Sequence, residues 1–105
     1  MELIKKSDAD KCQITIHGDL TIYQAHELKE ELLAELEQHQ TLEINMSEVN
    51  EIDTAGIQVL MLTKLESSRT GKRLRLIAHS RYVLEVVELF NLTDFFDDPI
   101  IVSSN

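Results

Sequence analysis

Strand-like and helix-like segments alternate along this chain, and that succession limits the possible folds more than any other feature of the sequence. Five segments alternate apolar and polar residues or form a short apolar run, as strands with a buried face do. They are residues 2–6, 12–17, 42–46, 73–78 and 100–102. Gly18 and Asp19 are expected to end the second of these strands, and residues 7–10 to form the turn before it.

The first helix is predicted over residues 22–38. Apolar residues recur there at the helical period, and Thr21 forms a capping box with Gln24 at its start. The opposite face carries five acidic residues: Glu27, Glu30, Glu31, Glu35 and Glu37. This acidic face is interpreted as a solvated surface.

The second helix is the most apolar. It is predicted to begin in Asp53–Gly56 and to end at Gly71, because glycine is favoured just after a helix. Its apolar side chains run most of the way round, which predicts a helix covered on two sides. These residues are Ile57, Val59, Leu60, Met61, Leu62 and Leu65, with Lys64 on the same stripe. In the alternative interpretation, Val59, Met61 and Leu62 are partly exposed and form a contact patch flanked by Lys64 and Arg69.

A third helix is predicted from its cap, Ser80, to a stop at Asn91, and residues 95–99 are expected to form a turn. At 105 residues and 12.0 kDa the chain has the size of one domain, residues 1–105. The pattern predicts an α/β fold: a mixed sheet of four to five strands with three to four helices packed on it in sequence order. No apolar run is long enough to enter a membrane and no secretory signal is recognisable, so a cytoplasmic protein is expected.

The net charge of −9 is unevenly distributed. Residues 1–53 carry all of the excess, with four lysines against thirteen acids, whereas residues 54–105 are neutral overall. The second half holds a basic strip that could meet an acidic partner surface: Lys64, Arg69, Lys72, Arg73, Arg75 and Arg81. The overall negative charge and the few aromatic residues argue against binding to nucleic acid.

The segment Asp53-Thr54-Ala55-Gly56 stands out because it opens the second helix. A helix N-terminus presents unpaired N–H groups, so a hydroxyl there either caps the helix or carries a phosphate that those groups stabilise. Asp53 is expected to cap the turn or to help hold a metal-nucleotide in a complex. Gly56 is expected to allow the backbone of a partner, such as an active-site loop of a kinase, to approach closely.

The chain resembles the STAS domains of bacterial anti-sigma factor antagonists over nearly its whole length. Five segments in one order carry the resemblance: residues 17–21, 42–49, 53–57, 71–76 and 89–96. The resemblance implies a STAS fold and a non-enzymatic signalling protein. It also implies that a serine/threonine kinase, often itself the anti-sigma factor, phosphorylates Thr54 and that a phosphatase removes the phosphate. The implied partner-binding residues are Asp53, Thr54, Ala55, Gly56, Ile57, Leu60 and Lys64.

Two positions differ from the commonest pattern of this family. Thr54 stands where serine is usual, and Asn91 where glycine is usual. Threonine offers the same nucleophilic oxygen, but its methyl group affects which kinase accepts it. The Thr-Ala-Gly sequence also resembles STAS proteins of chemosensory operons and the STAS subunit of a lipid-asymmetry ABC transporter. Docking on such a transporter's ATPase, or an adaptor role, without phosphorylation is therefore the alternative function.

Other kinds of chemistry find little support in the sequence. The four histidines show no metal-ligand spacing and none has an evident cysteine partner, so no metal site is predicted. Cys12 is interpreted as a small buried apolar residue. Three glycines cannot form a nucleotide-binding loop, and no serine has the setting of a catalytic nucleophile. We therefore expect no cofactor and no catalytic residue. A small enzyme that uses Asp53 and Thr54 is the third alternative function. The protein is expected to be a monomer or a weak dimer.

Overall fold

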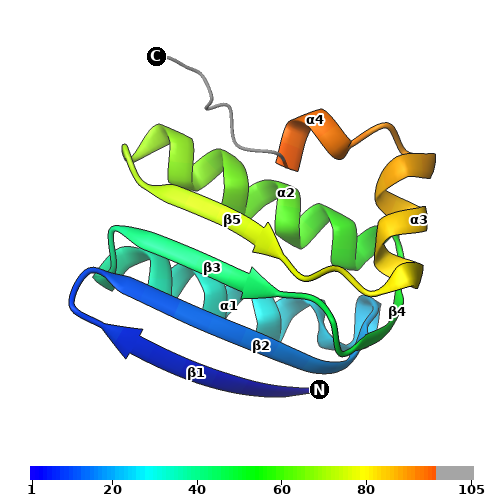
Figure 1. Cartoon of the computed structure of the whole chain (residues 1–105), viewed down its shortest axis with the longest axis horizontal. Coiled ribbons are helices and arrows are strands. Elements are labelled where there is room, and N and C mark those ends of the chain that lie inside the picture. Colours follow the sequence, from blue (N-terminus) through cyan, green and yellow to red (C-terminus); the bar gives the residue numbers. More distant parts are fainter. Residues whose placement is uncertain (97–105) are drawn as a thin grey trace.

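The computed structural model describes residues 1–96 of the chain. Strands and helices alternate along these residues, as Figure 1 shows. In order they are β1 (Glu2–Asp8), β2 (Lys11–Leu20), α1 (Ile22–Gln38), β3 (Thr41–Asn45), β4 (Val49–Ile52), α2 (Thr54–Arg69), β5 (Arg73–Ile77), α3 (Arg81–Leu89) and α4 (Thr93–Phe96). The prediction of an α/β domain with a mixed sheet of four to five strands and three to four helices is confirmed.

The sheet has the order β1-β2-β3-β5, with β1 antiparallel to β2 and the other neighbours parallel. The strand β2 is longer than expected, because Gly18 and Asp19 do not end it. The register shifts between these two residues, and beyond the shift β2 pairs with the short strand β4 instead of β3. The strand β4 is an addition to the strands expected from the sequence, since no strand was predicted between residues 46 and 53.

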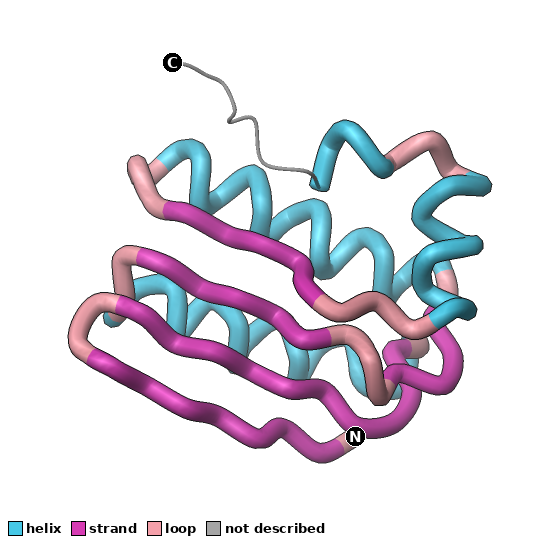
Figure 2. Tube along the Cα trace, viewed as in Figure 1, coloured by secondary structure: helices cyan, strands magenta, loops and turns pink. Residues whose placement is uncertain are grey.

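The helices α1 and α2 lie side by side on one face of the sheet (Figure 2). The core is formed between this helical layer and the inward side chains of the strands. Leu28, Leu32 and Leu36 of α1 are buried, as are Ile14 and Ile44 of the sheet. Burial of these apolar side chains is the main source of stability in such a two-layer domain.

On the opposite face of the sheet, no helix of the described chain covers β1, β2, β3 and β5 (Figure 1). The polar members of each alternating strand point there, as in sheets with one solvated face. Glu43 of β3 forms ion pairs across the strands, at 3.2 Å with Lys11 of β2 and at 3.4 Å with Arg75 of β5. The third helix, α3, does not extend this layer: it packs against β4 through its buried residues Val83 and Val87.

Local signals placed the helix ends correctly. The capping box of Thr21 and Gln24 is present, and Ser80 caps α3. Gly71 and Asn91 follow α2 and α3 with φ angles of 71° and 57°, which is the left-handed conformation typical of a helix C-terminus.

One further expectation was wrong. Phe95 and Phe96 belong to α4 and not to a turn: the backbone N–H of Phe96 donates a 3.1 Å hydrogen bond to the carbonyl oxygen of Leu92, and the Phe96 side chain is buried. The helix α2 is covered on two sides, by α1 and by the sheet, while Leu62 and Leu65 are about half exposed and Val59 is buried. The expected turn residues 97–99 and the expected closing strand, residues 100–102, lie outside the described residues. Among the residues described, no helix is long and apolar enough to cross a membrane.

Candidate functional site

The sheet brings the starts of two helices together. The parallel strands β2 and β4 end in register, with Leu20 opposite Ile52. Each strand is followed at once by a capping residue and a helix, Thr21 before α1 and Asp53 before α2. The N-termini of α1 and α2 therefore lie next to each other at the carboxyl edge of the sheet, where α/β folds commonly bind their ligands.

One carboxylate serves both helices. Oδ1 of Asp53 accepts a hydrogen bond of 3.1 Å from the backbone N–H of Gly56, in the first turn of α2. Its other oxygen, Oδ2, accepts a hydrogen bond of 3.0 Å from the backbone N–H of Ile22, the first residue of α1. Asp53 is thus the N-cap that was predicted for α2, and it also ties α1 to α2.

Gly56 has a different role from the one expected. A Cβ atom at this position would overlap the carbonyl oxygen of Leu20 and lie 3.0 Å from side-chain atoms of Leu20 and Ile52. The backbone that approaches Gly56 is therefore the chain's own strand β2. Because Gly56 is also buried, it lets α2 begin close against the sheet and is not open to a partner's loop.

Thr54 is the first residue of α2 and is exposed. Within residues 1–96 no hydrogen bond holds its hydroxyl group, so the oxygen is available to a modifying enzyme or to a partner. Two helix N-termini, each with the positive end of a helix dipole, meet around this position. The surroundings can therefore stabilise an added negative group such as a phosphate without a change of fold.

Two apolar side chains beside this position were not recognised in the sequence. Ile22 and Tyr23, in the first turn of α1, are 68% and 90% exposed. A large exposed aromatic residue is typical of the centres of protein interfaces. Ile22 continues the apolar period of α1, and only the exposure of its side chain shows that it is not part of the core. We call Ile22, Tyr23, Asp53, Thr54 and Ala55 the junction patch.

The remaining predicted contact residues lie deeper. Ile57 and Leu60 are buried core residues of α2. Lys64 is also buried, and its Nζ donates a 3.2 Å hydrogen bond to the carbonyl oxygen of Leu74 in the edge strand β5. These side chains position α2 from below the surface, whereas Asp53 and Ala55 are partly accessible.

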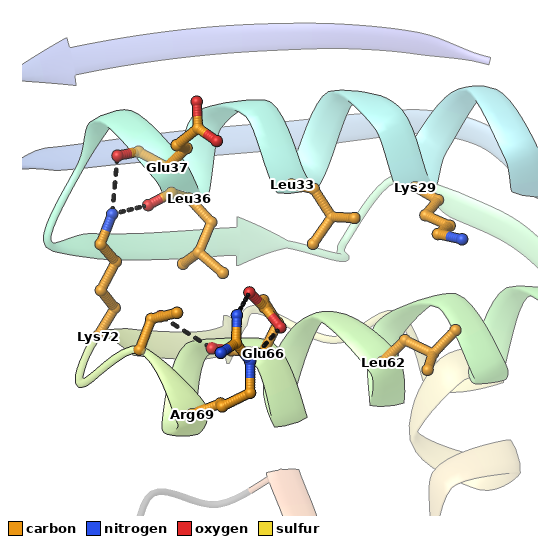
Figure 3. A pocket seen from close by; sticks show the side chains of 9 residues that line it. Lys29, Leu33, Leu36, Glu37, Leu62, Glu66, Arg69 and Lys72 are labelled. Carbon is orange, nitrogen blue, oxygen red and sulfur yellow. Dashed lines mark hydrogen bonds and ion pairs between the residues drawn. The ribbon is translucent and has the colours of Figure 1, made fainter.

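A groove of about 640 Å³ runs between α1 and α2, further along both helices (Figure 3). Leu33, Leu36 and Leu62 supply its apolar lining. At its end Lys72 donates hydrogen bonds to the carbonyl oxygens of Leu36 and Glu37, which closes the C-terminus of α1. This bond is one reason why the basic strip seen in the sequence is not a free cationic surface.

Other members of the strip have partners as well. Arg69 forms a 2.6 Å ion pair with Glu66, and its guanidinium group holds the pKa of that carboxyl below the usual range. Arg75 pairs with Glu43, and Lys64 is buried. The charge pattern of the sequence therefore overstates the positive surface that a partner would meet.

A second cluster of polar side chains lies at the other end of α1. Cys12 is buried as predicted, but the expectation that no histidine lies near it was wrong. One ligand atom each of Cys12, Glu35 and His39 lies within 4.8 Å of the others. No local pattern of residues indicates this cluster, because Cys12 is far along the chain from Glu35 and His39 and lies beside them only through the packing of β2 on α1.

Three comparisons with known proteins agree with this fold. The sequence model of the family described as "Mlab, STAS domain" matches residues 5–102. The anti-sigma-B factor antagonist of Bacillus subtilis (strain 168) is 27% identical over 92 residues, which cover 88% of this chain and 84% of that protein.

Two solved structures illustrate the likeness of the fold. A putative anti-sigma factor antagonist from Thermotoga maritima has a TM-score of 0.83 at 22% identity, over 90% of this chain and 83% of that one. The phosphorylated form of the Bacillus cell fate determinant SpoIIAA has a TM-score of 0.71 at 14% identity, over 89% of this chain and 86% of that one. Because the family match covers residues 5–102, which include both helix starts and nearly the whole sheet, the chain belongs to the STAS domain family.

Proposed function

We propose that this protein is a regulatory binding module of the anti-sigma factor antagonist kind, without catalytic activity of its own. In this proposal the junction patch binds a serine/threonine kinase that acts as an anti-sigma factor, and phosphorylation of Thr54 weakens that binding. A phosphatase restores it. The observation that carries the proposal is the exposed hydroxyl of Thr54, which no hydrogen bond holds within the described chain, at the meeting point of two helix N-termini.

The chemistry of the patch supports a switch that acts on the surface alone. A phosphate on Thr54 would add about −1.5 to −2 charges next to the carboxylate of Asp53. The two helix dipoles offset part of this charge within the domain. A partner that buries Ile22 and Tyr23 against its own surface would also have to strip water from the phosphate. Binding is therefore weakened by desolvation and by repulsion from any nearby acidic group.

Similar proteins support the same proposal by their names. A relative over most of the chain is named an anti-sigma-B factor antagonist, and one structure of similar fold is that of a phosphorylated form. Neither name extends by itself to Thr54, so this residue needs a direct test.

The test is the intact mass of the protein isolated from its own cells, with and without phosphatase treatment. We expect an added mass of one phosphate that phosphatase removes and that the Thr54→Ala variant lacks. Thr70→Ala, a change to another exposed threonine at the far end of α2, is the matched control and should keep the adduct. Absence of the adduct under all growth conditions, or its persistence in Thr54→Ala, would contradict the proposal.

A second candidate function is constitutive docking on the ATPase of a lipid transporter, or an adaptor role in a chemosensory system. Exposed apolar residues further along α2, Leu62 and Leu65, favour it, because they offer a contact surface that needs no phosphate. The two candidate functions predict different effects of a negative charge at position 54 on the affinity for the partner protein that is isolated with this one. Thr54→Glu should weaken a switched complex while Thr54→Ala preserves it, whereas constitutive docking along α2 should tolerate both and fail with Leu62→Ser.

A further inference from the structure

The cluster of Cys12, Glu35 and His39 is remote from the junction patch, at the end of the domain where α1 finishes and the turn between β1 and β2 lies (Figure 1). It joins a sulfur, a carboxylate oxygen and an imidazole nitrogen from two elements, β2 and the C-terminal turn of α1. Nothing in the proposed switch uses these three groups. We propose that they bind a zinc ion, with one position left for water.

The donor set fits zinc. Zinc in proteins takes thiolate, imidazole and carboxylate ligands in tetrahedral geometry. Ligand atoms about 2.0–2.3 Å from a tetrahedral zinc lie about 3.3–3.8 Å from one another. The three atoms already lie within 4.8 Å of each other, so small side-chain rotations bring them to that spacing. All three groups come from partly or fully buried residues, unlike the solvated carboxylates along α1.

Hydrogen bonds hold two of the ligands in place. Nδ1 of His39 lies 3.0 Å from the backbone carbonyl oxygen of Glu35. When Nδ1 donates to this oxygen, Nε2 carries the lone pair that a metal needs, which is the usual way that metal-binding histidines are oriented. Oε2 of Glu35 accepts a 2.9 Å hydrogen bond from Lys5, while Oε1 lies 3.5 Å from Nδ1 of His39 and faces the cluster.

The charges around the cluster balance when zinc is bound. Cys12 is fully buried, and its neutral thiol has to give up its proton to become a zinc ligand. Zinc binding forms the sulfur–zinc bond and releases that proton to water. The thiolate and the Glu35 carboxylate then neutralise the ion, while Lys5 remains paired with Glu31 at 2.6 Å. The bound site leaves no uncompensated buried charge, which would otherwise be costly.

The test uses the full chain, purified free of metal, with Co²⁺ as a spectroscopic probe and Zn²⁺ as a competitor. We expect one equivalent of Co²⁺ to give a thiolate-to-cobalt charge-transfer band together with the strong visible bands of a four-coordinate ion. One equivalent of Zn²⁺ should abolish both. Zn²⁺ should also raise the thermal midpoint of unfolding, because the ion joins α1 to β2.

Two variants assign the ligands. Cys12→Ser should remove the charge-transfer band, and His39→Gln should weaken zinc binding at least tenfold. His39→Gln is the stronger test, since His39 lies just after the last residue of α1 and outside the hydrophobic core, so the variant is expected to fold, which circular dichroism can verify. His26→Gln makes the same change at an exposed histidine of α1 outside the cluster and should leave the affinity unchanged. No charge-transfer band in the wild-type protein, or equal zinc affinity in His39→Gln and wild type, would overturn the proposal.

Discussion

Asp53 carries the largest structural role of any residue in the junction patch, because its two carboxylate oxygens cap different helices. Loss of a capping side chain costs about 0.5–2 kcal/mol, and Asp53→Ala removes two such bonds, so we expect a loss of about 2 kcal/mol in the free energy of unfolding. Urea unfolding measures it. The free energy of unfolding of Asp53→Asn should lie between those of wild type and Asp53→Ala. The amide keeps one acceptor oxygen, but its NH₂ group then faces the second backbone N–H and cannot accept a hydrogen bond from it.

Thr54→Ala is the control for that experiment, because the Thr54 side chain is exposed and holds no hydrogen bond in the described chain. It should change the free energy of unfolding by no more than about 0.5 kcal/mol. Equal stability of Asp53→Ala and wild type would show that the double cap has no energetic role.

Gly56 and Gly71 are required for two different structural reasons, and alanine variants allow the two to be compared. At Gly56 an added methyl group would meet the backbone of Leu20, which cannot rotate away, so Gly56→Ala should destabilise by about 2–3 kcal/mol. At Gly71 nothing lies within 4 Å of the added atom, and only the φ angle of 71° opposes it. Gly71→Ala should therefore cost about 1 kcal/mol. Thermal unfolding of both variants measures the difference, and a reversed order would contradict the close approach at Gly56.

The residues of the site were only partly predictable from the sequence. An aspartate before an apolar helix is a recognisable N-cap, and it was identified. The second bond of Asp53, to Ile22, depends on the end of β4 lying beside the end of β2, which no local pattern encodes. For Lys64 the sequence predicted a role at the surface that its burial does not support. A lysine in a helix is usually solvated, but this one extends under the surface to the edge strand β5.

At the scale of elements, long periodic segments were predicted well and short ones poorly. The repeated leucines and the capping box of α1 fix its limits without help from the rest of the fold. The strand β4 has only four residues, of which the two at its ends, Val49 and Ile52, are buried. That spacing is not the alternation of a strand, so its assignment depends entirely on pairing with β2 beyond Gly18.

The contact between β1 and α1 makes a prediction about pH. Lys5 of β1 pairs with Glu31 and Glu35 of α1 at 2.6 and 2.9 Å. The hydrogen bond from Lys5 lowers the pKa of Glu35 below its ordinary value of 4.5. The stabilisation is therefore fully present above pH 4.5 and is lost as the pH falls through the lowered pKa of the folded state.

We expect Lys5→Met to reduce the free energy of unfolding by about 0.5–1 kcal/mol near neutral pH, as partly exposed ion pairs do. The difference from wild type should shrink at an acidic pH below the lowered pKa of Glu35, where that carboxyl becomes protonated. Denaturant unfolding at both pH values gives the comparison. Lys6→Met, on the opposite face of β1, is the control. A difference that stayed constant with pH would mean that packing of the lysine stem, and not its charge, joins the two elements.

At the scale of the whole molecule, the excess of negative charge sets a limit on stability. The net charge of −9 is carried by residues 1–53, which include all of α1. Like charges repel each other more in the compact state than in the expanded unfolded chain. The ion pairs of the described residues involve only a few of the acids, so repulsion outweighs attraction overall.

Salt should therefore stabilise this protein. We expect the thermal midpoint of unfolding to rise by several degrees as NaCl is increased from about 0.01 M to about 0.5 M, because the screening length falls from about 30 Å to a few Å. A variant with Glu27, Glu30 and Glu37 all changed to glutamine, with a net charge of −6 in place of −9, should be more stable at low salt and respond less. These three exposed carboxylates take part in no ion pair of the described residues, so the change removes repulsion and little else. An equal rise of the thermal midpoint in both proteins would mean that salt acts by strengthening the burial of apolar surface in general. Repulsion within the acidic face of α1 would then not measurably lower the stability.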